Sequence, residues 1–165
     1  MKYDAEIAAA IAHWAPQLGV ALTPALVHAV IQKESSHVKL VTDEAGGHHS
    51  YGPMMVYDTT AIKYGIADPT TLQNPALGIW YGVRNLAEML HTFRGDVPAA
   101  VSAYNTGPAH AKRNAAGKFP NQPYVDAVLS FWNSYKGKAV AGGGAILAIV
   151  GGLLIARSLR KRRAA

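Results

Sequence analysis

Glu34 is the acidic residue best placed in the sequence for acid–base chemistry. It lies near the end of a helix expected over residues 24–35, because Thr23 is an N-capping residue and Pro24 fits the first helical position. Glu34 continues the apolar face of this helix, at helical spacings from three residues: Val27, Val30 and Ile31. It also lies in the last turn, where the helix dipole presents negative charge. Burial and the dipole both disfavour the ionised form, so we expect a raised pKa and a carboxyl group that can serve as a general acid.

Other interpretations of the acidic residues stay open. As a helix-end residue, Glu34 is also placed to pair with one of three lysines: Lys33, Lys39 and Lys63. Asp43 and Glu44 follow in the next loop and could approach Glu34 as a second carboxylate, although spacing alone does not show it. One well-placed acid without a clear partner argues against the usual glycosidase pair of carboxylates. It leaves room for a mechanism with one acid/base residue.

The elements that must position Glu34 are mostly helical, and no segment alternates convincingly with period two. Besides residues 24–35, we expect helices from Asp4 to Gly19, over 54–64, from Asn74 to Gly95, from Asp96 to Asn105 and over 124–135. Residues 36–52 read as a loop or short hairpin and residues 109–123 as a loop. The fold class is therefore mostly α, and residues 1–136 are long enough for one core.

Composition narrows the classes of function. The chain of 165 residues is 50% hydrophobic and has no cysteine, which excludes a disulfide scaffold and a cysteine-ligated metal centre. Basic and acidic side chains balance within residues 1–136, so the net charge of +6 lies wholly in residues 137–165. The basic character of the chain therefore gives no evidence of a nucleic-acid-binding face on residues 1–136.

Residues 139–156 form a run of 18 uncharged residues, long enough for a transmembrane helix. Basic residues flank the run at Lys138, Arg157 and 160–163. We therefore expect a globular domain over 1–136, one C-terminal transmembrane helix over 137–156 and a basic tail over 157–165, with a buried core helix as the alternative. The positive-inside rule places the tail on the cytoplasmic or genome side and the domain on the opposite face.

Two features of this C-terminal region bear on partners. Small residues recur every four positions, which leaves a homo-oligomer open: Gly144, Ala148, Gly152 and Ala156. The basic tail is interpreted as a topology signal, and contact with anionic lipid or nucleic acid is the alternative.

Four stretches, taken in order, resemble motifs of the lytic transglycosylase domain of the goose-lysozyme-like superfamily. They are residues 30–35 (VIQKES), 50–56 (SYGPMMV), 74–82 (NPALGIWYG) and 103–108 (AYNTGP), followed by a Tyr-Val pair at 124–125. The resemblance covers about residues 24–135. It implies a lysozyme-like fold and cleavage of the β-1,4 bond between N-acetylmuramic acid and N-acetylglucosamine in peptidoglycan. The sequence departs from the motifs at Met55, where the family has glutamine, and at Pro53, where it has leucine.

The resemblance also implies roles for individual residues. Glu34 would protonate the leaving oxygen and then help the muramoyl C6 hydroxyl to attack C1, forming a 1,6-anhydro end without a metal or cofactor. The substrate-binding residues would be Ser35, Ser50, Met54, Met55, Tyr104, Asn105 and Tyr124. Structural alternatives are a buried Tyr104, a helix-capping Asn105 and a Tyr124 that only anchors the last helix. No metal site is expected at His37, His48 and His49, because no carboxylate or thiolate spacing supports one.

The small size and basic tail are similar to those of lytic enzymes carried by membrane-containing bacteriophages. This likeness implies a single-pass protein of the virion membrane, with virion proteins as partners, that opens the cell wall locally during genome entry. A bacterial inner membrane with the domain in the periplasm is the alternative location. Two other functions stay open: a hydrolytic muramidase on the same fold, and a non-enzymatic membrane or capsid component with a degenerate glycan-binding domain.

Overall fold

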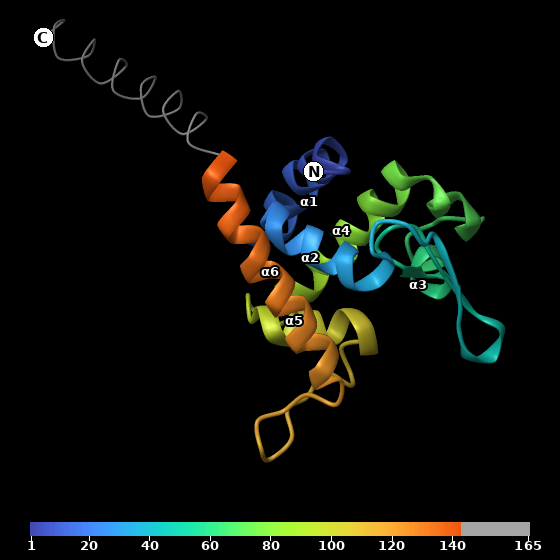
Figure 1. Cartoon of the computed structure of the whole chain (residues 1–165). Coiled ribbons are helices and arrows are strands. Elements are labelled where there is room, and N and C mark those ends of the chain that lie inside the picture. Colours follow the sequence, from blue (N-terminus) through green and yellow to red (C-terminus); the bar gives the residue numbers. More distant parts are fainter. Residues whose placement is uncertain (143–165) are drawn as a thin grey trace, which may run out of the picture.

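The structure, a computed structural model, describes residues 1–142 and shows a helical body beside a smaller lobe built on a short sheet (Figure 1). The helical body is formed by α1 (Asp4–Leu18), α2 (Pro24–Ser35), α4 (Pro75–Thr92), α5 (Val97–Thr106) and α6 (Gln122–Gly142). The lobe is formed by β1 (Val41–Asp43), the 3-10 turn η1 (Ala45–Gly47), β2 (His49–Tyr51), β3 (Val56–Tyr57), α3 (Asp58–Lys63) and the 3-10 turn η2 (Pro69–Gln73). The predicted mostly α class is confirmed.

Side-chain caps start three of the helices where the sequence predicts. The side chains of Thr23, Asn74 and Asp96 accept hydrogen bonds from backbone N–H groups at the starts of α2, α4 and α5, at 3.4, 3.0 and 3.1 Å respectively. Such caps satisfy N–H groups that have no partner within the helix. Asp4 does not act in this way: it is the first residue of α1, and its carboxylate bonds Nε2 of the buried His28 at 2.8 Å.

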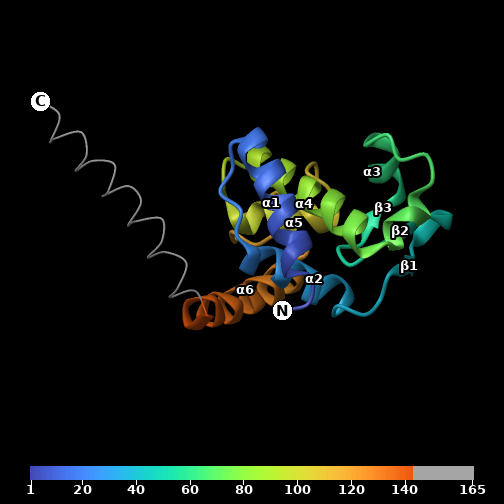
Figure 2. The ribbon, with the colours of Figure 1, turned by 90° about the horizontal axis from the view of Figure 1, so that it is seen from above.

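The helical body packs in pairs. Helix α6 lies along α2, and α1 lies along α4, with α5 beside both α4 and α6 (Figures 1 and 2). The apolar face predicted for α2 is confirmed, since Val27, Val30 and Ile31 are completely buried. Burying this face against α6 fixes the rotation of α2, and that rotation determines where the side chain of Glu34 points.

The lobe agrees with one prediction and corrects two others. Residues 36–52, expected to form a loop or a short hairpin, contain the hairpin: β1 pairs antiparallel with β2, with Thr42 opposite Ser50. The helix expected over 54–64 begins only at Asp58, because Val56 and Tyr57 form β3 and pair with β2. Residues 69–73, for which no helix was expected, form η2.

The lobe is joined to α4 through glycines that let the two backbones approach closely. A Cβ atom on Gly78 would lie 2.5 Å from the backbone oxygen of Leu72, and one on Gly82 would lie 2.5 Å from Cβ of Met54. Gly52 has a φ of +79°, and a Cβ there would lie 2.9 Å from Cα of Gly78. The second and third sequence motifs therefore meet at this junction, where side chains larger than hydrogen do not fit.

Helix α6 continues beyond its predicted end at Tyr135 to Gly142, without a break at Lys138. Within residues 1–142, no helix has the length and apolar character needed to cross a bilayer. Only the first residues of the expected transmembrane run, 139–142, belong to this part of the chain. The rest of the run and the basic tail lie outside the described residues.

Candidate active site

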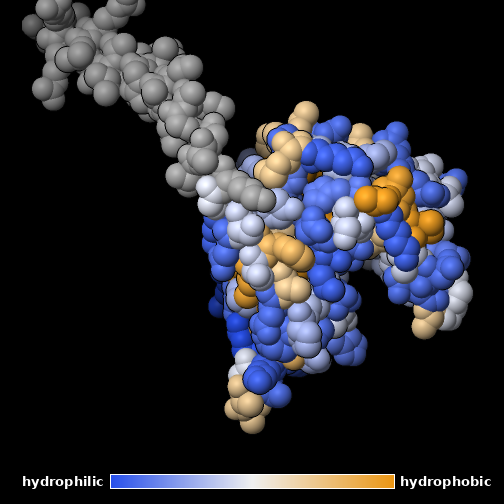
Figure 3. Space-filling model, viewed as in Figure 1, coloured by the Kyte–Doolittle hydropathy of each residue, from blue (hydrophilic) through white to orange (hydrophobic). Residues whose placement is uncertain are grey.

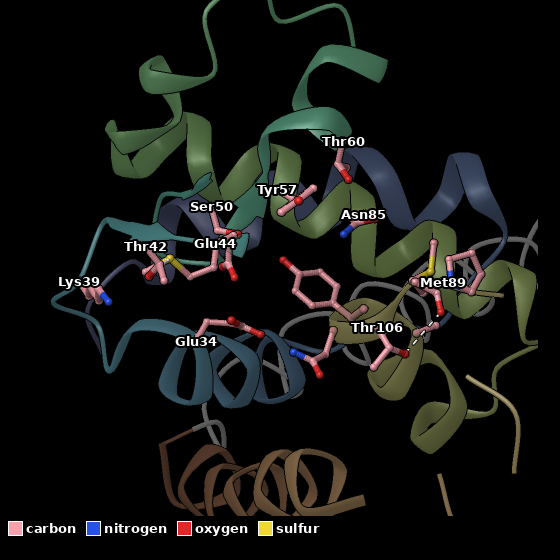
Figure 4. Close-up of a pocket in the computed structure, with 16 residues that line it drawn as sticks. Glu34, Lys39, Thr42, Glu44, Ser50, Tyr57, Thr60, Asn85, Met89 and Thr106 are labelled. Atoms are coloured by element: carbon pink, nitrogen blue, oxygen red, sulfur yellow. Dashed lines mark hydrogen bonds between the residues drawn. The ribbon is translucent and has the colours of Figure 1, made fainter. Parts of the chain in front are cut away.

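A cleft of about 620 Å³ lies between the helical body and the lobe. Figure 3 shows the surface hollowed between the two parts, and Figure 4 shows the side chains that face the space. The lining residues come from the end of α2, the sheet, α3, α4 and α5: Glu34, Lys39, Thr42, Glu44, Ser50, Met55, Tyr57, Thr60, Asn85, Met89, Ala103, Tyr104, Asn105, Thr106, Gly107 and Pro108. The volume is that of a typical ligand site.

Glu34 is partly buried, and its carboxyl group points into the cleft from the α2 side (Figure 4). The hydroxyl of Tyr124, on α6, donates a hydrogen bond to its Oε1. Loss of hydration on burial raises the pKa of Glu34 to about 7, although the Tyr124 bond and the charge of Lys33 both act to lower it. No Lys or Arg among residues 1–142 forms a salt bridge with Glu34, and Lys63 instead pairs with Glu88 at 3.5 Å. The ion-pair alternative for Glu34 is therefore not what the structure shows.

Tyr104 lines the cleft from α5, and its hydroxyl donates a 2.7 Å hydrogen bond to the backbone oxygen of Met54. This bond ties α5 to the turn that connects β2 and β3. Burial raises the pKa of Tyr104 well above its ordinary value, and the negative charge of Glu34 contributes in the same direction. The phenol is therefore a neutral group close to Glu34.

Ser50 and Met55, which the resemblance assigns to substrate binding, line the lobe side of the cleft. Ser50 is buried on the middle strand, opposite Thr42 on β1 and Tyr57 on β3. Met55 has a φ of +47°, and its sulfur accepts a 3.5 Å hydrogen bond from the hydroxyl of Thr42. At the position where the family motif has glutamine, this chain thus presents a thioether, which lacks the amide's hydrogen-bond donors.

Asn105 is exposed at the end of α5 and lines the cleft. Its side-chain oxygen accepts a 2.9 Å hydrogen bond from the amide of Asn121, just before α6. The side-chain oxygen of Asn121 in turn accepts a 2.7 Å bond from the hydroxyl of Ser102. Asn105 is therefore oriented by a partner rather than acting as a helix cap, and its amide NH2 group is its remaining hydrogen-bonding donor.

Three residues predicted to bind substrate, Ser35, Met54 and Tyr124, are not among those that line the cleft, and the Tyr124 hydroxyl is used in the bond to Glu34. The hydroxyl of Ser35 is buried, donates to the backbone oxygen of Ile31 and accepts from the backbone N–H of His37, each at 3.2 Å. It stabilises the end of α2 and therefore supports Glu34 indirectly. Met54 is completely buried against Gly82. Its side chain belongs to the core and is not exposed to the cleft.

Several cleft residues were not predicted, and Asn85 is the most informative of them. Asn85 projects from α4 into the cleft (Figure 4), and its side-chain oxygen is 3.4 Å from the hydroxyl of Tyr64. It lies seven positions after Gly78 and three after Gly82, on the helix face where these glycines meet the lobe. The sequence signal that could have identified Asn85 is therefore a polar residue on the same helix face as two glycines. Other unpredicted lining residues, such as Thr60 and Thr106, carry no comparable pattern.

Glu44 is a second carboxylate in the cleft, so of the two acids in the loop that could approach Glu34, it is Glu44 that does so. It lines the lobe side and points toward the space that Glu34 enters from the opposite side (Figure 4). Its negative charge is one of the causes that raise the pKa of Glu34. Its neighbour Asp43 is absent from the cleft lining: its side chain is 92% exposed and pairs with His49 at 3.3 Å.

Taken together, the cleft brings a carboxyl group that can hold its proton near neutral pH next to neutral phenols and uncharged hydrogen-bonding groups. This arrangement can donate a proton to an oxygen of a polar, uncharged ligand and can take a proton back from it.

A model of the transglycosylase SLT domain matches residues 14–124, a stretch that includes every site residue predicted from the sequence. Among solved structures, the chain is similar to an X-ray structure of an inactive glutamate-to-glutamine mutant of the lytic transglycosylase Slt from Pseudomonas aeruginosa. The TM-score is 0.66 and the identity 23%, over 86% of this chain and 25% of that one. The chain thus spans about a quarter of that protein's length. The likeness establishes a lysozyme-like fold.

Proposed function

This chain belongs to the transglycosylase SLT domain family, and from this premise we propose that it is a peptidoglycan lytic transglycosylase. The proposed substrate bond is the β-1,4 bond between N-acetylmuramic acid and N-acetylglucosamine, and the product is a 1,6-anhydromuramoyl end. The observation that carries the proposal is Glu34: a carboxyl group with a pKa raised to about 7, bonded to Tyr124, at the edge of a cleft of about 620 Å³.

In the first step, Glu34 gives its proton to the bridging oxygen while the bond from C1 to that oxygen breaks. Positive charge then develops at C1. The ionised Glu34 lies close enough to stabilise this charge, and the hydroxyl of Tyr124 holds the carboxylate in position by its hydrogen bond. Because burial raises the pKa of Glu34 to about 7, this carboxyl group still holds a proton near neutral pH, where an exposed glutamate would already be ionised.

In the second step, the C6 hydroxyl oxygen of the same muramoyl unit bonds to C1, and its proton returns to Glu34. One bond to C1 is broken and one is formed, so no water is consumed and Glu34 is restored. Ser50, Asn85 and Asn105 offer hydroxyl and amide groups to the sugars, and the thioethers of Met55 and Met89 offer apolar surface. These contacts would hold the muramoyl unit in the geometry that ring closure needs.

Digestion of purified peptidoglycan by the full-length chain tests this proposal, with Glu34→Gln as the variant and Asp43→Asn as the control. Glutamine keeps the shape of Glu34 but cannot donate its proton, so we expect anhydromuropeptides from the wild type and from Asp43→Asn, and a loss of at least 10²-fold for Glu34→Gln. Mass spectrometry of the fragments distinguishes 1,6-anhydro ends from hydrolysed ends. Products that carry only hydrolysed ends would favour the muramidase instead, and equal lysis by Glu34→Gln would favour a non-enzymatic component.

We also propose that residues 139–156 anchor the domain in a membrane. The support is the uncharged run itself and the continuation of α6 into its first residues. Lys138, Arg157 and the basic residues at 160–163 flank the run at its two ends, as is usual for a transmembrane helix. We expect the full-length chain to float with liposomes and the double variant Leu147→Arg, Val150→Arg to remain in solution. Equal flotation of both proteins would contradict the anchor.

The location that we propose is the virion membrane of a bacteriophage, where local cleavage of the cell wall would assist genome entry. The support is the uncharged run over residues 139–156 and the basic residues that follow it. Detection of the chain in purified, detergent-extracted virions would test it. Detection only in the inner membrane of uninfected bacteria would favour the alternative setting.

A further inference from the structure

Asn85 is held in one orientation where it faces the cleft from α4 (Figure 4). The hydroxyl of Tyr104 donates its proton to the backbone oxygen of Met54 at 2.7 Å, so its own oxygen is left to accept a hydrogen bond. Asn85 supplies that bond: burial raises the pKa of Tyr104, and the hydrogen bond from the Asn85 side chain acts to lower it, as a donor to the phenol oxygen does. The amide NH2 group of Asn85 therefore points toward Tyr104, and its Oδ1 points toward the hydroxyl of Tyr64, at 3.4 Å.

Tyr64, the residue after α3, meets Asn85 from outside the cleft lining, and three contacts fix it there. Its hydroxyl donates a 2.9 Å hydrogen bond to Oε2 of Glu88, which lies three positions after Asn85 on α4. Its ring stacks on that of Tyr81 with the centroids 6.0 Å apart, and the guanidinium carbon of Arg84 lies 4.0 Å from the Tyr64 centroid. Nε of Arg84 in turn donates to Oε1 of Glu88 at 3.1 Å. Burial and the negative charge of Glu88 raise the pKa of Tyr64, so its hydroxyl stays protonated and remains a donor.

We propose that Tyr64 is a positioning residue, which fixes the amide of Asn85 so that its NH2 group binds an acceptor oxygen of the glycan; this inference rests on the proposed function. Tyr64 acts through Asn85, because it is itself absent from the cleft lining. The Asn85 amide has two N–H donors: one meets Tyr104, and the other has no acceptor among residues 1–142 and is left for a hydroxyl or acetamido oxygen of a sugar. Without the Tyr64 hydroxyl, Oδ1 loses its donor and the amide can rotate. Binding must then fix the amide again, which lowers the affinity.

Steady-state kinetics of the full-length chain in detergent solution test this inference. The substrate is soluble, uncross-linked peptidoglycan strands, and mass spectrometry counts the 1,6-anhydro ends. Tyr64→Phe is the test variant, because it removes the hydroxyl and keeps the ring. Tyr81→Phe is the matched control: Tyr81 stacks on Tyr64, is absent from the cleft lining, and its hydroxyl forms no hydrogen bond within residues 1–142. Asn85→Ala and the double variant Tyr64→Phe, Asn85→Ala complete a cycle that shows whether Tyr64 acts through Asn85.

We expect Tyr64→Phe to raise KM about three- to tenfold and to leave kcat within about twofold of the wild type, because a binding contact is weakened and Glu34 is untouched. Tyr81→Phe should leave both constants unchanged. Asn85→Ala should raise KM at least as far as Tyr64→Phe does, and the double variant should match Asn85→Ala, since the hydroxyl of Tyr64 then has no amide to hold.

An unchanged KM for Tyr64→Phe, an equal rise for Tyr81→Phe, or effects that add in the double variant would overturn this inference and leave the transglycosylase proposal standing. A fall in kcat for Tyr64→Phe without a rise in KM would overturn it as well. Absence of anhydro ends from the wild type would instead reject the proposed function itself.

Discussion

The hydroxyl of Tyr124 donates a hydrogen bond to Oε1 of Glu34 and thereby joins the last helix of the domain to the end of α2. The bond acts against burial: it favours the ionised carboxylate, whereas loss of hydration favours the protonated form. The balance leaves the pKa of Glu34 at about 7, where the group can both donate a proton and take it back near neutral pH. The packing of α6 along α2 is thus directly tied to the chemistry of the cleft.

Replacement of Tyr124 by phenylalanine tests this balance. Without the hydroxyl, the ionised form of Glu34 loses a hydrogen bond and its pKa rises further above 7. Activity that needs protonated Glu34 falls as the pH rises through this pKa, so we expect the falling limb of the pH–rate profile to move upward by about one pH unit. A limb that stays in place or moves to lower pH would contradict the role assigned to Tyr124.

The raised pKa of Glu34 also predicts a cost in stability. An unfolded glutamate loses its proton near pH 4.3, whereas folded Glu34 keeps it up to about pH 7. Between these values the folded state binds more protons, so stability falls as the pH rises through this window. We expect Glu34→Gln to be more stable than the wild type above pH 7, by on the order of 1–3 kcal/mol, because Glu34 is only partly buried. The advantage should vanish below pH 4. Thermal unfolding of the two full-length chains at pH 4 and pH 8 measures it, and equal differences at both pH values would refute the linkage.

Substitution of Gly78 tests the junction between the lobe and α4. An alanine Cβ would lie 2.5 Å from the backbone oxygen of Leu72, which cannot move without shifting η2. We expect Gly78→Ala to lower the free energy of unfolding by about 2 kcal/mol or more. Gly137→Ala is the control: Gly137 is also helical, and a Cβ there meets no atom within 4 Å. It should gain about 0.5–1 kcal/mol from helix propensity. Similar effects of the two substitutions would argue against close packing at Gly78.

The helical body could be predicted from the sequence because its signals are local. The spacing of Val27, Val30 and Ile31 determines the buried face of α2, and this face carries Glu34 to the cleft. The caps at Thr23, Asn74 and Asp96 are likewise set by side chains within three residues of the bonds they make.

The lobe and several positions of the candidate site could not be predicted from the sequence, because they depend on contacts between residues that are distant along the chain. Nothing local to Tyr124 indicates that its hydroxyl meets a carboxyl group ninety positions earlier. Val56 and Tyr57 join the sheet because β2 is available to pair with them, which outweighs a helical pattern over 54–64. Ser35 and Met54 lie within motifs, yet their side chains turn to the helix end and the core. Glu44 was visible as an acid in the loop, but only the hairpin geometry brings it to the cleft.

Titration of the Glu34 carboxyl group itself tests the central claim most directly. The chain has four glutamates, Glu6, Glu34, Glu44 and Glu88, so carbon NMR of full-length chain labelled with [¹³C]glutamate gives few carboxyl signals. The Glu34→Gln variant identifies the one that belongs to Glu34. We predict a midpoint at about pH 7 for this signal. A midpoint near pH 4.3, the ordinary value for a solvated glutamate, would mean that the group is ionised at neutral pH and would contradict its role as the acid.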